Sequence, residues 1–510
     1  MPQVDPKIRK PQVTYFLTRN VFLRSLGFIY LIAFAGLAHQ MVTLVGHDGI
    51  LPAEIFLKKV ELAYGEGWGA FSRLPTIFWF FLSDHILEVL STIGIGLSIL
   101  LVMGFANPIL LLALWGLYIS FVHIGQIFYG YGWEMMLLEA GFLAVFLCPI
   151  TSWKISKIKT HPPAVIFWLY RWMLFRVMFG AGLIKLRGHE CWRDLTCLYY
   201  HFETQPIPNP LSRFLHFMPS WFLKSGVVMN HFVEIVAPWF LFWPRRLRIV
   251  FGLIQIGFQI TLIVSGNLSW LNWLTLVLCI PCLDDQFLLK FSPRHVKKRF
   301  IKIIQNGSRT HISHRVMVWM FTVLTLILSI GPIMNMISPT QAMNMSFNNL
   351  YLVNTYGAFG YIGQERFEVI LEGTTDELIT SQTKWIPYEF PCKPGSVDRR
   401  PCVVSPYHYR LDWQIWFAAM SKFEYQPWLM HLTIKLLEGD SRVLRLLGDD
   451  PFSGAAPKYI RADLYRYQFT KPGTDTTDWW KRSRIRTYFP PLSLDHPVVQ
   501  TFIKTQRQRP

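Results

Sequence analysis

The chain has 510 residues, of which 52% are hydrophobic, and its formal net charge is +18. Apolar runs of about 18 residues or more recur before residue 338, and such runs are typical of bilayer-spanning helices rather than of a soluble protein. A basic excess indicates nucleic-acid binding only where it lies on a soluble face, so the positions of the charges decide between these two classes of protein.

The apolar runs predict an α-helical polytopic membrane domain over residues 21–337, with about nine spans. Because three of the runs are short, any number from about five to nine remains open. The first run is expected to stay as a signal anchor, with residues 1–20 in the cytoplasm, because no small-residue cleavage site follows it. The aromatic segment 75–83 is expected at the membrane interface rather than across the bilayer. The predicted spans lie at about 21–40, 86–104, 107–125, 134–150, 163–186, 229–243, 249–266, 269–283 and 316–337.

The distribution of charge tests this map. If nine spans alternate, four segments share one side of the membrane: 1–24 with net charge +4, 151–162 with +3, 244–248 with +3 and 284–315 with +6. Together they hold +16 of the total of +18, which is the positive-inside pattern. The pattern predicts a cytoplasmic N-terminus and a basic cytoplasmic loop over 284–315. It also removes the main reason to expect nucleic acid as a partner.

The long apolar runs stop after Ile337. Residues 338–510 contain 21 basic and 17 acidic side chains and predict a soluble α+β domain on the lumenal side. Alternating stretches at 366–371 and 465–469 predict strands, and the apolar spacing of 428–447 predicts one or two helices. The loop 187–228, which follows the fifth predicted span, is expected on the same side.

Four of the seven cysteines fall in these predicted lumenal segments. Cys392 and Cys402 flank a Lys-Pro-Gly turn, a spacing that suits a disulfide in an oxidising compartment, with two free buried thiols as the alternative. Cys191 and Cys197 are expected to form a second bridge.

Two further kinds of motif must be weighed against their surroundings. Cys279 and Cys282 have the spacing of a redox CxxC motif, but they lie in an apolar span without a thioredoxin-like pattern and are expected to be structural. Three N-x-[ST] sequons predict a glycoprotein. Asn306 is expected to be cytoplasmic and bare, Asn267 lies at the membrane edge, and Asn344 is lumenal but close to the last span.

Ionisable residues inside spans are costly and are candidates for function. Six gather near the predicted lumenal ends of spans three to six, where we expect a polar cavity in which Glu139 pairs with Lys185. Ordinary roles compete, because Lys185 can reach the interface and Glu134 can stabilise a helix N-terminus. Arg171 and Arg176 are expected to be structural. The six candidates are His123, Glu134, Glu139, Lys185, His231 and Glu234.

Sequence motifs for known enzyme classes are missing. The chain contains no Walker A, G-x-S-x-G, H-E-x-x-H or Rossmann glycine pattern, and its Asp, His and Cys residues do not fall in metal-ligand spacings. We therefore expect neither a metal nor a cofactor.

Several long motifs, in order from about residue 14 to about residue 494, resemble those of the lipase maturation factor family. GAGLIKLRG begins at Gly180, CWRDLTC at Cys191 and HFETQPIPNP at His201. The further matches are SGNLSWLNW from Ser265, NTYGAFG from Asn354, SPYHYRLDW from Ser405 and YFPPLS from Tyr488.

This resemblance implies an endoplasmic reticulum membrane protein that helps secreted lipases of the lipoprotein lipase type to fold and to assemble into active dimers. It implies a chaperone-like factor rather than an enzyme, with lipases as clients and lumenal chaperones or oxidoreductases as further partners. The client is expected to meet residues 187–228 and 338–510. Client-contact candidates, each with core packing as the alternative, are Tyr407, His408, Tyr409, Arg410, Trp413, Trp479 and Trp480.

Two points qualify the location. The C-terminal sequence QRQRP carries no KDEL-type or dilysine retrieval signal, so retention is expected to come from the spans or from a partner. In a bacterial source the corresponding place would be the inner membrane, and the client would be unknown.

A shorter match supplies the alternative function. AGLIKL followed by Trp192 is similar to a segment of the vitamin K-dependent carboxylase and its multi-span relatives, where a lysine acts as a base. This likeness implies a membrane-embedded enzyme with Lys185 as the base and Glu139 beside it. The two hypotheses differ over Lys185→Met, which a folding factor is expected to tolerate at little cost and an enzyme is not. A transporter is less favoured, because the chain shows no inverted repeat.

Overall fold

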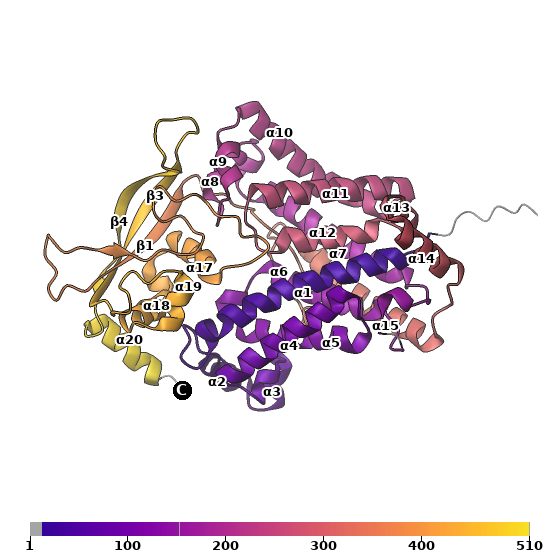
Figure 1. Cartoon of the computed structure of the whole chain (residues 1–510), viewed down its shortest axis with the longest axis horizontal. Helices are drawn as coiled ribbons and strands as arrows, with labels where there is room; N and C mark the ends of the chain where they lie inside the picture. Colours follow the sequence, from indigo (N-terminus) through magenta and orange to yellow (C-terminus); the bar gives the residue numbers. More distant parts are fainter. Residues whose placement is uncertain (1–12, 152, 509–510) are drawn as a thin grey trace, which may run out of the picture.

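The computed structural model describes residues 13–151 and 153–508, and the chain forms an elongated molecule (Figure 1). A bundle of helices occupies one end and a smaller domain with a β-sheet occupies the other. Most of the predicted cytoplasmic N-terminus, residues 1–20, and the last two residues of the QRQRP sequence lie outside the described part of the chain.

In the described part of the chain, a helical segment coincides with each of the nine predicted spans. Among the described residues, six of them are long and apolar enough to span a membrane. These are α1 (Phe16–Val45), α4 (Asp84–Met103), α7 (Ala164–Arg187), α10 (Ser220–His231) with its continuation to Phe242, α11 (Arg245–Ser265), and α15 (Ile312–Leu328) with α16 (Ile330–Ile337). The three shorter segments are α5 (Pro108–Ile124), α6 (Gly132–Ala144) and α12 (Leu271–Cys279).

Contacts at the ends of α1, α7 and α12 show where these three helices start. The backbone N–H of Phe16, at the start of α1, donates to Asp285 (2.7 Å), and Arg19 on α1 donates to the carbonyl of Thr160 just before α7 (3.2 Å). Helix α12 instead begins beside the other domain, where Trp273 Nε1 donates to Ser405 Oγ (3.0 Å). Helices α1 and α7 therefore start at one end of the bundle, and α12 starts at the opposite end.

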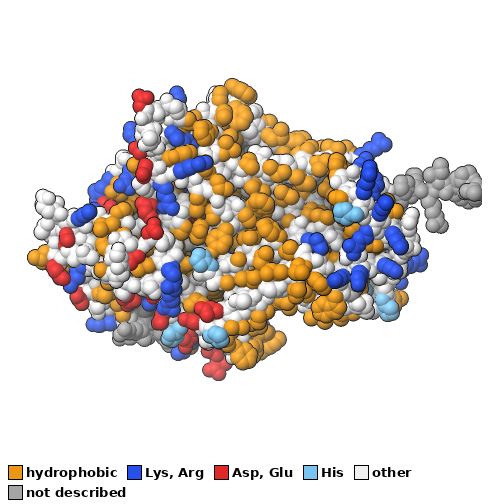
Figure 2. Space-filling view, viewed as in Figure 1, with side chains coloured by type: hydrophobic (Ala, Val, Ile, Leu, Met, Phe, Trp, Pro, Cys, Tyr) orange, Lys and Arg blue, Asp and Glu red, His pale blue; other side chains and the backbone are white. Residues whose placement is uncertain are grey.

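The end of the bundle far from the sheet domain is basic. There the predicted loop 284–315 forms α13 (Asp285–Phe291) and α14 (Arg294–Gln305). Phe300 on α14 packs against Phe16 and Leu17, while the Lys and Arg side chains of the same helix are exposed. Figure 2 shows Lys and Arg gathered at this end and hydrophobic side chains over the middle of the molecule. This distribution is typical of a membrane protein with one basic face.

Local sequence signals set the turn between α4 and α5. Gly104 ends α4 with φ +92°, a left-handed conformation that favours glycine. Asn107 then caps α5, since its side chain accepts from the N–H of Leu110 (2.8 Å), and Pro108 occupies the first helical position. These residues allow two consecutive helices to reverse direction within a few residues.

The connection from α1 to α4 holds α2 (Ala53–Tyr64) and α3 (Trp68–Arg73). The aromatic segment 75–83 forms only a single 3-10 turn, Ile77–Trp79, and leaves Phe80 and Phe81 68% and 66% exposed. The prediction that this segment is not a further span is confirmed. Other 3-10 turns lie at Gln126–Tyr129, Val145–Leu147, Ile155–Lys157, Glu190–Trp192 and Phe423–Tyr425.

The predicted lumenal loop 187–228 is shorter than expected. It contains α8 (Leu198–Thr204) and α9 (Pro210–His216), and the sixth crossing segment already begins at Ser220. The sequence predicts a later start because the polar residues Lys224 and Ser225 interrupt the apolar run. The helix continues through them, since both side chains lie on its exposed face.

The sheet domain confirms the predicted α+β class. Its antiparallel sheet has the order β2-β1-β3-β4. The strands are β1 (Arg366–Thr374), β2 (Ile386–Pro387), β3 (Tyr459–Phe469) and β4 (Trp480–Leu492), and the helices are α17 (Arg410–Ala419), α18 (Pro427–Leu437), α19 (Ser441–Leu447) and α20 (Pro497–Gln508). The strands predicted at 366–371 and 465–469 and the helices predicted within 428–447 are therefore present.

The sheet domain begins later than the change in composition. Before β1, the chain runs back along the bundle, where the N–H of Asn354 donates to Glu139 Oε2 (3.0 Å). Val369 and Leu371 of β1 then enter the main core. The predicted boundary at residue 338 thus marks the end of α16, and β1 at Arg366 starts the folded sheet.

Candidate functional site

The six ionisable candidates lie toward the end of the bundle that faces the sheet domain, but in separate sets of contacts. Glu134, Glu139, Lys185 and Glu234 are each at most 5% exposed. Buried polar groups are costly unless they are hydrogen-bonded, and buried charges are costly unless they are paired. The partners of each group therefore indicate what it does.

Lys185, near the end of α7, is held by the sixth crossing segment. Its Nζ donates to Glu234 Oε1 (2.6 Å) and to Asn230 Oδ1 (3.1 Å), and it lies 4.9 Å from the ring centre of Trp192. Asn230 in turn donates to Glu234 Oε2 (3.0 Å). Glu234 lies in a π-helical turn, Phe232–Val236, a feature often found where a side chain is specially positioned.

Glu139 on α6 has different partners. Arg176 on α7 pairs with it, and Asn354 and Tyr356 also donate to its Oε2, from the backbone N–H (3.0 Å) and the hydroxyl (2.8 Å) respectively. Arg176 Nη1 also donates to the carbonyl of Asn354 (2.6 Å). The predicted pairing of Glu139 with Lys185 is wrong, because Lys185 faces Glu234 while the chain before β1 and Arg176 enclose Glu139.

The two candidate histidines bind backbone oxygens. His123 Nδ1 lies 3.0 Å from the carbonyl oxygen of Pro75, and His231 Nε2 lies 2.9 Å from that of Trp192. Each contact ties a crossing helix to a neighbouring loop. The residues predicted to line a polar cavity therefore act, in this structure, mainly as ties between elements.

Glu134 at the start of α6 connects the bundle to the sheet domain. Its Oε1 accepts from Arg410 Nη1 (2.5 Å), its Oε2 accepts from Tyr118, and Arg410 also donates to the carbonyl of Phe128 (2.8 Å). The Arg410 guanidinium lies 3.8 Å from the ring centre of Tyr129. Arg410 is therefore a buried interdomain contact and not, as predicted, a residue that meets a client.

Most of the other client-contact candidates are also buried. His408 and Trp413 pack with Tyr131 and Trp133 of the bundle, and burial holds the pKa of His408 well below its usual range. Tyr407 is half-buried, and its hydroxyl lies 2.6 Å from His39 Nδ1 on α1.

Three candidates remain to be placed. Tyr409 is half-buried, Trp480 is buried, and Trp479 lies partly covered by the Arg213 guanidinium at 4.7 Å. The alternative of core packing applies to His408, Arg410 and Trp413, because the aromatic motif from Ser405 forms the interface between the two domains. It also applies to Trp480, which packs in a separate cluster on the sheet with Tyr467 and Phe469.

Both predicted disulfides are present. Cys191 and Cys197 are bonded, with Cα atoms 4.8 Å apart, and Cys392 and Cys402 are bonded, with Cα atoms 5.5 Å apart. Cys279 and Cys282 are free and buried, as expected for structural cysteines.

The Cys392–Cys402 loop is fixed from both domains. Asp412 Oδ1 accepts from the N–H groups of Cys392 (2.7 Å) and Lys393 (2.8 Å), and Asn267 Nδ2 donates to the carbonyl of Cys402 (3.0 Å). Burial raises the pKa of Asp412 to about 6, although those two N–H groups and Lys393 oppose the shift. Asn267, the first sequon, is thus a buried contact between the end of α11 and the disulfide loop.

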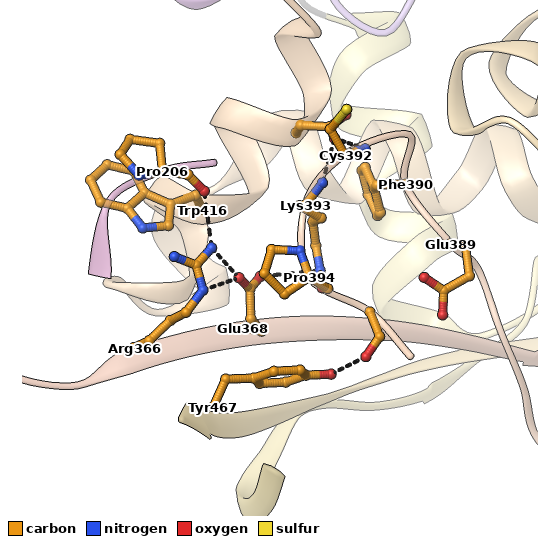
Figure 3. Close-up of polar contacts among 12 residues, drawn as sticks. Pro206, Arg366, Glu368, Glu389, Phe390, Cys392, Lys393, Pro394, Trp416 and Tyr467 are labelled. Atoms are coloured by element: carbon orange, nitrogen blue, oxygen red, sulfur yellow. Dashed lines mark hydrogen bonds and ion pairs between the residues drawn. The ribbon is translucent and has the colours of Figure 1, made fainter. Parts of the chain in front are cut away.

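A second set of contacts clamps the loop 187–228 to the sheet (Figure 3). Arg366 on β1 donates to the carbonyls of Glu203 (2.9 Å), Gln205 (2.5 Å) and Pro206 (2.9 Å), and it pairs with Glu368 (2.5 Å). Lys393 lies 3.1 Å from the other oxygen of Glu368. Glu203 Oε2 accepts from the N–H of Phe469 (2.6 Å).

Arg213 on α9 completes this clamp. Its Nε donates to the carbonyl of Thr470 (2.7 Å) and its Nη2 to that of Lys471 (3.3 Å), in the turn between β3 and β4. The loop 187–228 and the sheet therefore form one joined surface. Sequence reasoning missed Arg366, Glu368 and Arg213. For the first two, the available signal was two opposite charges two positions apart at the start of a predicted strand.

One group of three potential metal ligands lies close together in the described part of the chain. The donor atoms of His189, Cys191 and Cys197 are all within 4.8 Å of one another. Metal binding needs thiolates, and here both sulfur atoms are bonded to each other. The group therefore does not fit a metal site in this form of the chain.

Two family models match the chain. The lipase maturation factor transmembrane domain matches residues 17–290, and the lipase maturation factor C-terminal domain matches residues 352–490. These ranges correspond to most of the helical bundle and to most of the region that follows it.

Curated relatives match nearly the whole chain. It is 45% identical to lipase maturation factor 1 of Homo sapiens over 505 residues, which cover 94% of this chain and 89% of that protein. It is equally similar, at 45%, to lipase maturation factor 1 of Mus musculus over 527 residues (98% and 91%). The identity to lipase maturation factor 2 of Xenopus laevis is 32% over 604 residues (96% and 84%). No solved structure matches the chain significantly.

Proposed function

The chain belongs to the lipase maturation factor family, and from this premise we propose that it works in the endoplasmic reticulum membrane, where it assists the folding and dimer assembly of secreted lipases of the lipoprotein lipase type. It is a multi-pass membrane protein. In this proposal the N-terminus and the basic end with α14 are cytoplasmic, and the sheet domain is lumenal. The positive-inside distribution of charge supports this orientation.

The observation that carries the proposal is the clamp between the lumenal loop and the sheet. Arg366, Arg213 and Glu203 join the loop to β1 and to the β3–β4 turn. Client-facing parts that come from two separate regions of the sequence thereby form a single fixed surface. A fixed surface is suited to hold a client in one orientation, because less freedom is lost when binding occurs.

The disulfides support the compartment. Cys191–Cys197 and Cys392–Cys402 lie on the proposed lumenal side, whereas the free Cys148, Cys279 and Cys282 lie in the bundle. Disulfides form and persist in oxidising compartments such as the endoplasmic reticulum lumen. Lumenal chaperones or oxidoreductases are proposed as further partners on this side.

The geometry around Lys185 favours the maturation factor over the enzyme. A general base must offer a free lone pair, but the Lys185 ammonium is engaged by Glu234 and Asn230 and faces the Trp192 ring. These contacts hold Nζ against side chains of the chain itself. They also revise the expectation that Lys185→Met costs little, since that variant leaves Glu234 buried without its cation.

The experiment measures the secretion of active lipase from cells that lack the endogenous factor, rescued with this chain and scored per unit of chain in the membrane. We expect rescue by the unchanged chain and by Lys185→Met/Glu234→Gln, which removes both charges of the pair. Arg213→Met is expected to lower active lipase at unchanged abundance, because it loosens the clamp without leaving a buried charge.

The control is Arg445→Met, which removes an exposed arginine of α19 in the sheet domain, away from the clamp. Failure of the unchanged chain to rescue would refute the proposed function. Rescue by Arg213→Met at the level of the control would show that the joined surface is not needed. Loss of rescue in the abundant Lys185→Met/Glu234→Gln variant would favour the enzyme.

A further inference from the structure

Strand β4 forms an open edge of the sheet. In the order β2-β1-β3-β4 it has a neighbour on one side only, and it is the longest strand of the sheet, with 13 residues. Every residue from Lys481 to Thr487 is exposed. An edge strand presents backbone N–H and C=O groups along its free side, and these groups can pair with a further strand.

This edge also carries the excess charge of the domain. Residues 338–510 contain 21 basic and 17 acidic side chains, a net charge of +4. The stretch 481–487 has the sequence KRSRIRT, with four basic side chains and no acidic one, so it alone has a net charge of +4. The other charged residues of residues 338–510 balance one another.

The basic side chains differ in their contacts within the chain. Arg484 pairs with Asp463 on β3 (2.7 Å), and Arg482 donates to the hydroxyl of Tyr467 (3.3 Å). Among the described residues, Lys481 and Arg486 take part in no ion pair. Two cations on the edge are therefore available to a partner, and two are positioned beside them by the sheet.

Charge on an edge strand is a common protection against pairing with other chains. Here the protection is selective. A second copy of β4 would bring four more positive charges to the same place, and like charges opposite each other are destabilising. An acidic strand would instead gain from each cross-strand pair. The stretch from Trp480 to Arg484 pairs with β3 without a register shift, whereas shifts follow beyond it. Because the N–H of Trp480 already donates to the carbonyl of Val397 (3.0 Å), the regular edge that is open to a partner runs from Lys481 to Arg484.

We propose that the β4 edge binds an extended, acidic segment of a partner polypeptide, which adds to the sheet as a further antiparallel or parallel strand. Main-chain hydrogen bonds supply affinity in this mode, and the basic row supplies the choice of an acidic sequence. The proposal rests on the proposed function only in naming a lipase client as that partner. The binding itself can be tested without any lipase.

The position of β4 favours a polypeptide over an anionic lipid surface. The strand lies on the outer side of the sheet domain, and the bundle lies on the other side of the domain (Figure 1). The apolar crossing helices fix the level of the bilayer, so the β4 edge is held away from it. Acidic headgroups attract basic segments only within about a Debye length of the membrane surface.

The test uses the detergent-purified full chain and three fluorescent peptides of about six residues, the usual length of a strand. The first alternates Glu with Val and Thr, the second has Lys in place of Glu, and the third keeps the Glu residues but has Pro at alternate positions, which prevents strand pairing. We expect the first peptide to bind at least about tenfold more tightly than either of the others.

The variant Lys481→Glu/Arg486→Glu reverses the two unpaired cations and leaves the contacts of Arg482 and Arg484 in place. This variant is expected to weaken the binding of the first peptide about tenfold. The control Lys384→Glu/Lys422→Glu reverses two exposed lysines elsewhere in the same domain and should leave binding unchanged. Thermal unfolding of each variant verifies that the domain is intact.

Three outcomes would overturn the proposal. Equal binding of the acidic peptides with and without Pro would show charge attraction without strand addition. An equal loss of binding of the first peptide in Lys481→Glu/Arg486→Glu and in the control would show that β4 is not the site. Tighter association of the unchanged chain with vesicles that contain anionic lipid, lost in Lys481→Glu/Arg486→Glu, together with no peptide binding, would assign the edge to lipid.

Lipase rescue by a chain that fails to bind peptide would leave the proposed function standing and remove only this site.

Discussion

Arg410 of the sheet domain and Glu134 of the helical bundle form an ion pair with 2.5 Å between Nη1 and Oε1, although the two residues belong to different domains. Both side chains are at most 1% exposed. Tyr118 also donates to Glu134, and Arg410 also donates to the carbonyl of Phe128. This buried pair fixes the orientation of the sheet domain on the bundle.

Arg410→Met is expected to destabilise the chain by about 3–5 kcal/mol, because it leaves the Glu134 carboxylate buried and unpaired. The midpoint of thermal unfolding in detergent measures the loss. Arg410→Met/Glu134→Gln should recover part of it, since both charges are then absent. Arg466→Met, which breaks a half-exposed pair with Glu365, should cost less than about 1 kcal/mol. A similar midpoint for Arg410→Met and Arg466→Met would contradict the role of the interdomain pair.

Lys185→Met is expected to reduce the amount of chain in the membrane, because Glu234 loses its cation, while Lys185→Arg keeps the charge and should be milder. Lys185→Met/Glu234→Gln should restore the amount of chain. Quantitative immunoblotting of membrane fractions makes the comparison. If Lys185→Met accumulates normally, the Lys185–Glu234 pair does not contribute to stability, and a buried lysine at this position must have another role.

The fold was largely predictable from the sequence, because its signals are local. An apolar run such as that of α7 specifies a helix wherever it lies, and the alternation at 366–371 specifies β1. The disulfides were predictable for the same reason, since each joins cysteines only 6 and 10 positions apart. The predicted start of the sixth span was wrong, because the polar residues Lys224 and Ser225 interrupt the apolar run although the helix begins before them.

The partners within the site were not predictable, because they depend on how separate elements meet. The sequence places Glu139 and Glu234 at similar levels of the bundle, but only the rotation and packing of the helices decide that Lys185 faces Glu234. The motif from Ser405 contains aromatic and charged residues that suit either a binding edge or a buried network. It became buried because the sheet domain packs back onto α1 and α6.

Asp412→Asn is expected to change the pH dependence of stability between about pH 4 and pH 6. The folded chain keeps a proton on Asp412 up to a pKa of about 6, whereas the usual value is 3.8, so the folded state binds more protons than the unfolded state in this range. The Asp412 contribution to stability therefore falls as the pH rises, by up to about 3 kcal/mol in total. Asparagine keeps the acceptor oxygen and does not titrate.

The measurement is the difference in unfolding midpoint between the unchanged chain and Asp412→Asn across this pH range. His201 and His408 have lowered pKa values and contribute with the opposite sign, but the subtraction removes their effect. The difference should shift in favour of Asp412→Asn as the pH rises from 4 to 7. A constant difference would mean that Asp412 does not titrate in this window.

Ser269→Ala is expected to leave the electrophoretic mobility of the chain unchanged. It removes the sequon of Asn267 without altering that side chain, whose Nδ2 is buried and donates to the carbonyls of Pro208 (3.3 Å) and Cys402 (3.0 Å). A glycan on this nitrogen would have to displace both contacts, so the folded chain has no room for one.

Ser308→Ala removes the sequon of Asn306 at the proposed cytoplasmic end and should also leave the electrophoretic mobility unchanged. Only Ser346→Ala can then abolish a shift caused by endoglycosidase, because Asn344 is half-buried on the proposed lumenal side. A faster-migrating Ser269→Ala chain would show that Asn267 is glycosylated, and the contact of Asn267 with the disulfide loop could not exist in that population.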